Sequence, residues 1–183
     1  MNAIDSQLFL FLNGLHAEWL DTVMVSITSM WPWIPLYGLL LFMVFRQYGK
    51  RGWWVLLAVA LVILCSDQLS AHVCKPLFHR LRPCFNPELE GMVHLPNGLP
   101  GGKYGFVSSH AANTFAVAAF LTAVLRKQWR WIGWVLYFWA FISSYSRIYV
   151  GVHYPGDILC GAALGILIGL IVALAIKKLG MRN

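Results

Sequence analysis

Residues 158–176 read ILCGAALGILIGLIVALAI, an apolar run without a charged side chain. A helix of about 20 apolar residues crosses the hydrocarbon core of a bilayer. Of the 183 residues, 59% are hydrophobic and only 11% are charged, whereas an ordinary soluble domain has about 25% charged residues. So few charges cannot cover a compact soluble domain, which excludes that class and predicts an apolar outer surface. We therefore expect residues 1–183 to form a single membrane domain.

Other apolar runs of similar length precede this one, and a lipid-exposed backbone must satisfy its own hydrogen bonds, so all of them are predicted to be helices. They are Thr22–Phe45, Trp53–Cys74, Val107–Leu125 and Trp131–Val150. Pro32 and Pro35 should bend the first run. Within residues 1–20, the segment Ile4–Leu15 predicts either an amphipathic interfacial helix or a short sixth span. The fold class is thus an all-α membrane bundle of five to six spans.

The basic residues predict the orientation of this bundle. Nine of the 14 Lys and Arg residues follow the first, third and fifth runs, which alternating helices place on one side: Arg46, Lys50, Arg51, Arg126, Lys127, Arg130, Lys177, Lys178 and Arg182. Cytoplasmic loops carry an excess of such residues, so this side is predicted to be cytoplasmic. The long connection 75–106 then faces the exterior or periplasm of a bacterial inner membrane. Residues 1–6 contain no Lys or Arg, so we expect no cleavable signal.

The net charge of +7 does not by itself predict a nucleic-acid partner, because the basic residues lie in short clusters between apolar runs. Membrane topology explains these clusters better, so we expect no nucleic-acid binding. The basic residues other than the nine that predict the orientation fall on the side where positive charge is disfavoured, close to two histidines at span ends. Ionisable groups at such positions are functional candidates. Together they predict an anion site, with phosphate as the anion: Lys75, Arg80, Arg82, Lys103 and Arg147, with His110, His153 and Asp157 beside them.

Three blocks with fixed internal spacing sharpen this prediction. The first block has Lys75 seven residues before Arg82 and then Pro83, the second is the tetrapeptide 107–110, VSSH, and the third runs from Ser146 to Asp157. Their spacing and order resemble the type 2 phosphatidic acid phosphatase family, whose signature is K-x6-RP, then PSGH, then SR-x5-H-x3-D. The resemblance implies a phosphatidic acid phosphatase/haloperoxidase-like core. The chain departs from the signature where Val107 replaces proline and Ser109 replaces glycine.

The resemblance also implies roles for the matching residues. His153 would be the nucleophile that forms a phosphohistidine, and Asp157 would orient its ring and stabilise the developing positive charge. His110 would protonate the leaving oxygen. The substrate phosphate would be held by Lys75, Arg82, Arg147 and Ser108, with main-chain N–H groups at a helix start and the Ser109 hydroxyl within reach. Such chemistry requires neither a metal nor another cofactor.

The implied activity is that of a metal-independent lipid phosphatase acting on a lipid phosphate or diphosphate at the outer leaflet. We favour undecaprenyl diphosphate or lipid A phosphate, because the predicted site faces outward in a short chain. Phosphatidylglycerol phosphate and phosphatidic acid remain alternatives. Rivals from other classes are a protein that binds or transports a lipid phosphate without cleaving it, and a vanadate-dependent haloperoxidase. The oligomeric state stays open.

Several residues have no assigned place in the signature. We favour solvated loop charges for Arg80 and Lys103, with contact to the substrate headgroup as the alternative. Asp67 lies inside a span, where a charge is costly, and either supports the site from behind or has a structural role. Whether Cys74 and Cys84 form a disulfide stays open. His72, His79 and His94 lack a spaced set of carboxylates or cysteines, so we expect no metal site there.

Overall fold

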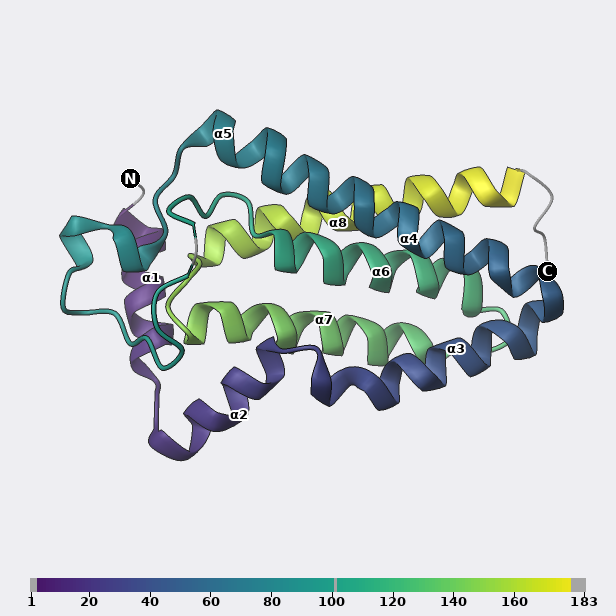
Figure 1. Ribbon diagram of the computed structural model, residues 1–183, viewed down its shortest axis with the longest axis horizontal. Helices are drawn as coiled ribbons and strands as arrows, with labels where there is room; N and C mark the ends of the chain where they lie inside the picture. Colours follow the sequence, from purple (N-terminus) through teal and green to yellow (C-terminus); the bar gives the residue numbers. More distant parts are fainter. Residues whose placement is uncertain (1–2, 101, 179–183) are drawn as a thin grey trace.

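The structure, a computed structural model, describes residues 3–100 and 102–178. Long helices run side by side along the molecule: α4 (Gly52–Gln68), α6 (Ser109–Leu125), α7 (Ile132–Tyr149) and α8 (Pro155–Lys178). On the side of α7, α2 (Glu18–Thr28) and α3 (Ile34–Tyr48) follow one another, and α1 (Ala3–Gly14) lies across one end of the bundle (Figure 1). The prediction of an all-helical bundle is confirmed.

Short elements connect or extend these helices. α4 continues through a π-helical segment, Leu69–Cys74, into α5 (Lys75–Phe78). Short 3-10 turns cover Trp31–Trp33, Gly49–Arg51, Pro83–Phe85 and Pro87–Leu89. Within the described ranges, the long loop after α5 contains an isolated antiparallel bridge between Leu81 and Tyr104. This bridge fixes the two halves of the loop against each other.

The helix boundaries differ from the predicted runs in two places. The first run is divided into α2 and α3 at Ser29, whose backbone is extended, just before the 3-10 turn that contains Pro32, so the predicted bend is a complete break. The second run continues to Phe78, which places Lys75 in a helix and not in the long loop. Two helical stretches, Trp31–Phe78 and Pro155–Lys178, are long and apolar enough to span a membrane.

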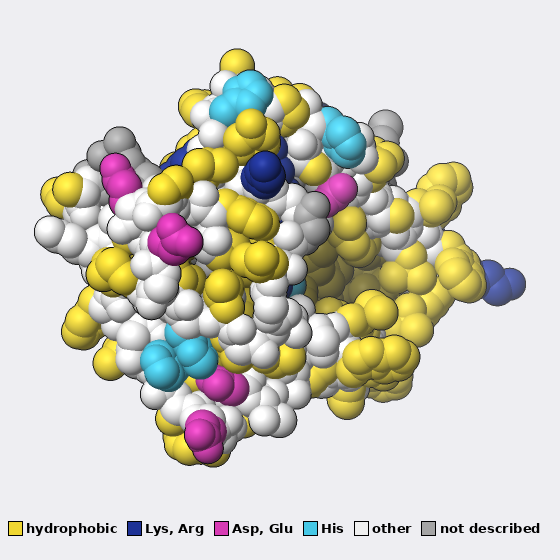
Figure 2. Space-filling view, turned by 60° about the vertical axis from the view of Figure 1, so that its left-hand side comes forward, with side chains coloured by type: hydrophobic (Ala, Val, Ile, Leu, Met, Phe, Trp, Pro, Cys, Tyr) yellow, Lys and Arg dark blue, Asp and Glu magenta, His cyan; other side chains and the backbone are white. Residues whose placement is uncertain are grey.

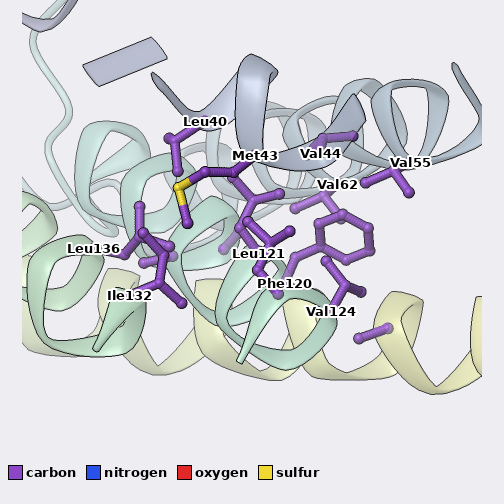
Figure 3. Close-up of a cluster of buried hydrophobic side chains, with 14 of the residues drawn as sticks. Leu40, Met43, Val44, Val55, Val62, Phe120, Leu121, Val124, Ile132 and Leu136 are labelled. Atoms are coloured by element: carbon purple, nitrogen blue, oxygen red, sulfur yellow. The ribbon is translucent and has the colours of Figure 1, made fainter. Parts of the chain in front are cut away.

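The outer surface is apolar, as the composition predicts. Trp134 is 84% exposed and Leu159 is 70% exposed, and many other large apolar side chains also point outward from the bundle. The buried core lies between α3, α4, α6 and α7, where Met43, Phe120 and Leu136 pack together (Figure 3). These exposed side chains fit a surface that faces lipid.

The predicted topogenic segments gather at one end of the bundle. The α3–α4 turn, the α6–α7 turn and the end of α8 lie together, opposite the end that carries α1 and the long loop (Figure 1). Arg182 lies outside the described residues. The helices therefore alternate in direction as predicted, and the described basic segments lie at one end of the bundle.

Helices α6 and α8 pack closely because α8 presents glycines to α6. A Cβ atom on Gly161, Gly165 or Gly169 would clash with a backbone carbonyl oxygen of α6 or of its cap, those of Ser108, Ala112 and Ala116 respectively. The glycines are spaced four residues apart and lie on one face, the arrangement that lets membrane helices approach. This contact fixes the start of α6 beside the start of α8.

We expect Gly165→Ala to destabilise the protein, because the new methyl group would meet the Ala112 carbonyl. Overpacking of this kind costs about 1–3 kcal/mol. Gly38→Ala in α3 is the matched control, since a Cβ there meets nothing within 4 Å and alanine is the better helix former. Thermal unfolding in detergent should show a lower Tm for Gly165→Ala alone; equal Tm values for both variants would contradict the packing described.

Candidate active site

Three segments that are distant in the sequence meet at the end of the bundle opposite the basic turns. They are α5 with the loop that follows it, the start of α6, and the end of α7 with the turn into α8. Figure 2, which brings this end forward, shows charged and histidine side chains gathered among apolar ones, beside a hollow lined with hydrophobic side chains. The signature residues predicted from the sequence lie on these three segments.

The two cations of the first block are held by different partners. Lys75 Nζ donates a hydrogen bond of 2.9 Å to Ser109 Oγ at the start of α6. The Arg82 side chain is buried, and its terminal nitrogen NH1 lies 3.3 Å from His153 Nε2 and 3.5 Å from the Val152 carbonyl oxygen. The first block is thereby joined to both of the others.

Arg147 comes from the last turn of α7 and donates a hydrogen bond of 2.6 Å from NH1 to Thr28 Oγ1 in α2. The Nε atoms of Arg82 and Arg147 are buried and have no hydrogen-bond partner among the described residues. Buried donors are almost always paired, and guanidinium groups bind phosphate oxygens with strong, charge-assisted hydrogen bonds. The two guanidinium groups therefore suit a bound anion.

His153 lies between a carboxylate and a guanidinium. Its Nδ1 is 3.4 Å from Asp157 Oδ2, and its ring is only 3% exposed. Burial, with a smaller contribution from the charges of Arg82 and Arg147 and against the opposing effect of Asp157, lowers the pKa of His153 to about 4. The ring is therefore neutral near pH 7. When Nδ1–H is donated to Asp157, Nε2 carries the lone pair of the ring and accepts from the Arg82 guanidinium.

The start of α6 holds the second block. Ser108 is the N-cap, and its Oγ accepts a hydrogen bond of 3.4 Å from the Ala111 N–H. His110 lies in the first turn, with Nε2 3.0 Å from Ser143 Oγ of α7. Ser143 was not identified from the sequence, and nothing in its local pattern marks it. The helix start supplies main-chain N–H groups and a positive dipole end to the site.

The prediction that Arg80 is a solvated loop charge is wrong. Arg80 NH1 donates a hydrogen bond of 2.8 Å to Asp157 Oδ1, and NH2 donates one of 2.5 Å to Asp5 Oδ2. Alternate residues of an extended segment share a face, and Leu81 between the two arginines pairs with Tyr104. The spacing Arg80-x-Arg82 was the available signal that both side chains point toward the site.

Gly105 is a second position that sequence analysis missed. Its N–H donates a hydrogen bond of 2.9 Å to the Arg80 carbonyl oxygen. A Cβ at this position would lie 3.1 Å from Arg82 Cγ and from Asp157 Oδ2, and 3.4 Å from His153 Nδ1. The absence of a side chain lets the loop backbone pass directly behind the histidine–carboxylate pair.

Within the described chain, the side chains of the other flagged residues form no hydrogen bond with Lys75, Arg82, Arg147, His153 or Asp157. Asp67 Oδ1 accepts a hydrogen bond of 3.4 Å from Asn113 Nδ2, which gives it a structural partner in α6. The Lys103 side chain is exposed. Cys74 and Cys84 are free thiols. His94 pairs with Asp21 at 2.8 Å, and across residues 3–100 and 102–178 no group of three or more His, Cys, Asp or Glu residues is placed to hold a metal ion.

Comparison with known proteins gives a consistent result. The family model described as the PAP2 superfamily matches residues 51–181. The chain is 42% identical over 168 residues to a lipid A 4'-phosphatase of Bacteroides thetaiotaomicron, covering 90% of this chain and 73% of that protein. It is 32% identical over 164 residues to an undecaprenyl-diphosphatase of Sulfolobus acidocaldarius, covering 87% and 72%.

The fold also has a solved counterpart. The crystal structure of a transmembrane PAP2-type phosphatidylglycerolphosphate phosphatase from Bacillus subtilis superposes with a TM-score of 0.71 at 24% identity. The superposition covers 100% of this chain and 90% of that chain. The arrangement of helices is therefore that of a membrane protein of known fold.

We expect Gly105→Ala to weaken anion binding, because the methyl group would press on Arg82 and on the pair formed by His153 and Asp157. Displacements of this kind cost about 1–3 kcal/mol, which corresponds to a loss of roughly five- to a hundredfold in affinity. Titration calorimetry with inorganic phosphate would measure it. Gly102→Ala, where a Cβ meets nothing within 4 Å, is the control; equal affinities for both variants would contradict the close approach.

Proposed function

The chain belongs to the PAP2 superfamily, and on that basis we propose that it hydrolyses a phosphate group from a membrane lipid. The observation that carries the proposal is the position of His153, a buried neutral imidazole between Asp157 and Arg82. A protein that only binds a lipid phosphate needs cations but no paired histidine. The His153–Asp157 pair therefore favours an enzyme over a binding or transport protein.

In the first proposed step, His153 Nε2 attacks phosphorus and the bond from phosphorus to the lipid oxygen breaks. His110 gives its proton to the departing lipid oxygen, and His153 becomes a phosphohistidine. Asp157, which accepts from Nδ1, stabilises the positive charge that develops on the ring. Lys75, Arg82 and Arg147 balance the negative charge on the equatorial phosphate oxygens, together with Ser108, Ser109 and the α6 start.

In the second proposed step, a water molecule attacks the phosphohistidine from the side that the lipid has left. His110, now neutral, takes a proton from this water, and the bond between phosphorus and Nε2 breaks. Inorganic phosphate leaves, and both histidines return to their starting states. Each proton and electron pair is accounted for by side chains of this chain, water and the substrate, so the proposed reaction needs no metal ion.

The position of the site at the end of a membrane bundle supports a lipid substrate, which would arrive with its tails in the bilayer. A phosphate of lipid A is our first candidate, because the relative that is 42% identical carries that activity in its name. Undecaprenyl diphosphate is the second, from the relative that is 32% identical. We propose that the basic turns face the cytoplasm of a bacterium and that the site faces the periplasm or exterior.

We expect His153→Ala to abolish both phosphate release and a covalent intermediate. Purified protein in detergent would be mixed with lipid labelled in its phosphate group and quenched in alkaline denaturant, and the protein-bound label measured. The label should be lost on acid treatment, as expected for a phosphohistidine, and should be absent from His153→Ala. His72→Ala, at an exposed position outside the site, is the control. If His153→Ala released phosphate at the wild-type rate and retained the protein-bound label, the assignment would be refuted.

We expect His110→Ala to impair cleavage of a monophosphate ester more than cleavage of a diphosphate. A lipid alkoxide is strongly basic and depends on the general acid, whose contribution is typically about 10²- to 10⁴-fold. A departing phosphate group is far less basic. The value of kcat/KM should be measured on lipid A and on undecaprenyl diphosphate with wild type and variant. An equal loss of kcat/KM on both substrates would contradict this role for His110.

A further inference from the structure

We propose that Arg80 and Asp5 are positioning residues, which hold the Asp157 carboxylate in the orientation that aligns His153. This inference rests on the proposed phosphatase function. The three side chains form one connected bridge, here called the Asp5–Arg80–Asp157 bridge, in which a single guanidinium joins two carboxylates. Asp5 lies outside the three signature blocks, and Arg80 occupies a position of the first block at which the signature specifies no residue.

The first step of the argument concerns Asp157, whose side chain is fully buried. Its Oδ2 accepts a hydrogen bond of 3.0 Å from the Tyr154 N–H and lies 3.4 Å from His153 Nδ1. Its Oδ1 accepts from Arg80 at 2.8 Å. Without Arg80, this buried Oδ1 would lose its charged donor, and a buried acceptor without a partner is costly. The carboxylate would then rotate or move, and His153 would lose its alignment.

The second step concerns Asp5, which holds Arg80 from the other side. Asp5 Oδ2 accepts from Arg80 NH2, and Oδ1 accepts a hydrogen bond of 2.9 Å from the Gly156 N–H at the start of α8. A Cβ on Gly156 would lie 2.7 Å from Asp5 Oδ2, so glycine is needed for this approach. Asp5 therefore ties α1 directly to the turn that carries His153 and Asp157.

The third step concerns the aromatic rings that pack around Arg80 and hold it in place. The Arg80 guanidinium lies 4.2 Å from the centroid of the Tyr154 ring, within the range of a cation–π contact. Phe9 of α1 packs edge-on against the same ring with centroids 5.4 Å apart, and both rings are fully buried. Helix α1 thus forms part of the support of the site, in addition to any contact that it makes with the membrane.

The fourth step separates Arg80 from the phosphate-binding cations. Both terminal nitrogens of Arg80 donate to carboxylates, whereas Arg82 and Arg147 each have a buried Nε without a partner in the described chain. Arg80 therefore acts through Asp157 and not on the phosphate. Its loss should lower the rate of phosphoryl transfer and leave the affinity for phosphate unchanged.

The test compares Arg80→Ala, Arg80→Lys and Asp5→Asn with wild type. Steady-state kcat and KM on lipid A, and the inhibition constant of inorganic phosphate, are measured in detergent. In metal sites, partners that orient a ligand from behind typically contribute about 10- to 100-fold, and we expect a loss of kcat of that order for Arg80→Ala. Arg51→Ala and Glu18→Gln, which change exposed charges of the same signs, are the matched controls and should retain wild-type kcat.

The phosphate inhibition constant gives the readout that distinguishes positioning from binding. It should stay within about twofold of wild type in Arg80→Ala and rise in Arg82→Ala, since a lost charge-assisted hydrogen bond weakens anion binding. Added guanidinium should partly restore kcat to Arg80→Ala. Arg80→Lys keeps the charge but reaches one carboxylate in place of two, so we expect an intermediate kcat. Asp5→Asn should lose less than Arg80→Ala.

Three results would overturn the inference. One is a wild-type kcat in Arg80→Ala and Asp5→Asn; another is a phosphate inhibition constant that rises in step with the loss of kcat. If Arg80→Ala does not fold, Arg80→Lys and Asp5→Asn decide the question through the same two constants. The third is a wild-type protein that releases no phosphate from any lipid phosphate. That result would refute the proposed function itself, whereas the first two results refute only the positioning role of Arg80 and Asp5 in an active enzyme.

Discussion

The Asp157 carboxylate and its own main-chain carbonyl connect the loop after α5, the α6 start and the α8 start. The side chain accepts from Arg80 and from the Tyr154 N–H, and it orients His153. The main-chain oxygen accepts a hydrogen bond of 3.1 Å from Ser108 at the start of α6. A buried carboxylate must be fully hydrogen-bonded to remain charged away from water. The carboxylate thus holds the loop after α5 against the α8 start, and the main-chain hydrogen bond adds the α6 start.

The packing of the bundle makes this meeting feasible. The glycine face of α8 lets α6 approach so closely that the Ser108 carbonyl lies against Gly161. The same approach brings the Ser108 N–H to the Asp157 carbonyl. The packing of the helices and the geometry of the site are therefore not independent. The glycine face that stabilises the bundle also sets the distance between the α6 start and the α8 start.

The amino-terminal helices support the site from outside the region that matches the family model, which begins at residue 51. Asp5 of α1 holds Arg80, and Thr28 of α2 accepts a hydrogen bond from Arg147. The first contact fixes the cation that holds Asp157, and the second restrains Arg147, a long side chain of the proposed anion site. Long, flexible side chains lose conformational freedom when they bind an anion, and restraint before binding reduces that cost.

The sequence by itself determined the class of protein, the approximate spans and the signature residues, because hydropathy and motif spacing are local properties of the chain. It identified Lys75, Arg82, His110, Arg147 and His153 without any contact being known. Only the tertiary structure revealed Arg80, Asp5 and Gly105 beside the pair formed by His153 and Asp157, and it placed Lys75 in a helix. Asp5 and Arg80 are 75 positions apart, and a partnership over that distance depends on which helix ends meet in space, a property that no local pattern encodes.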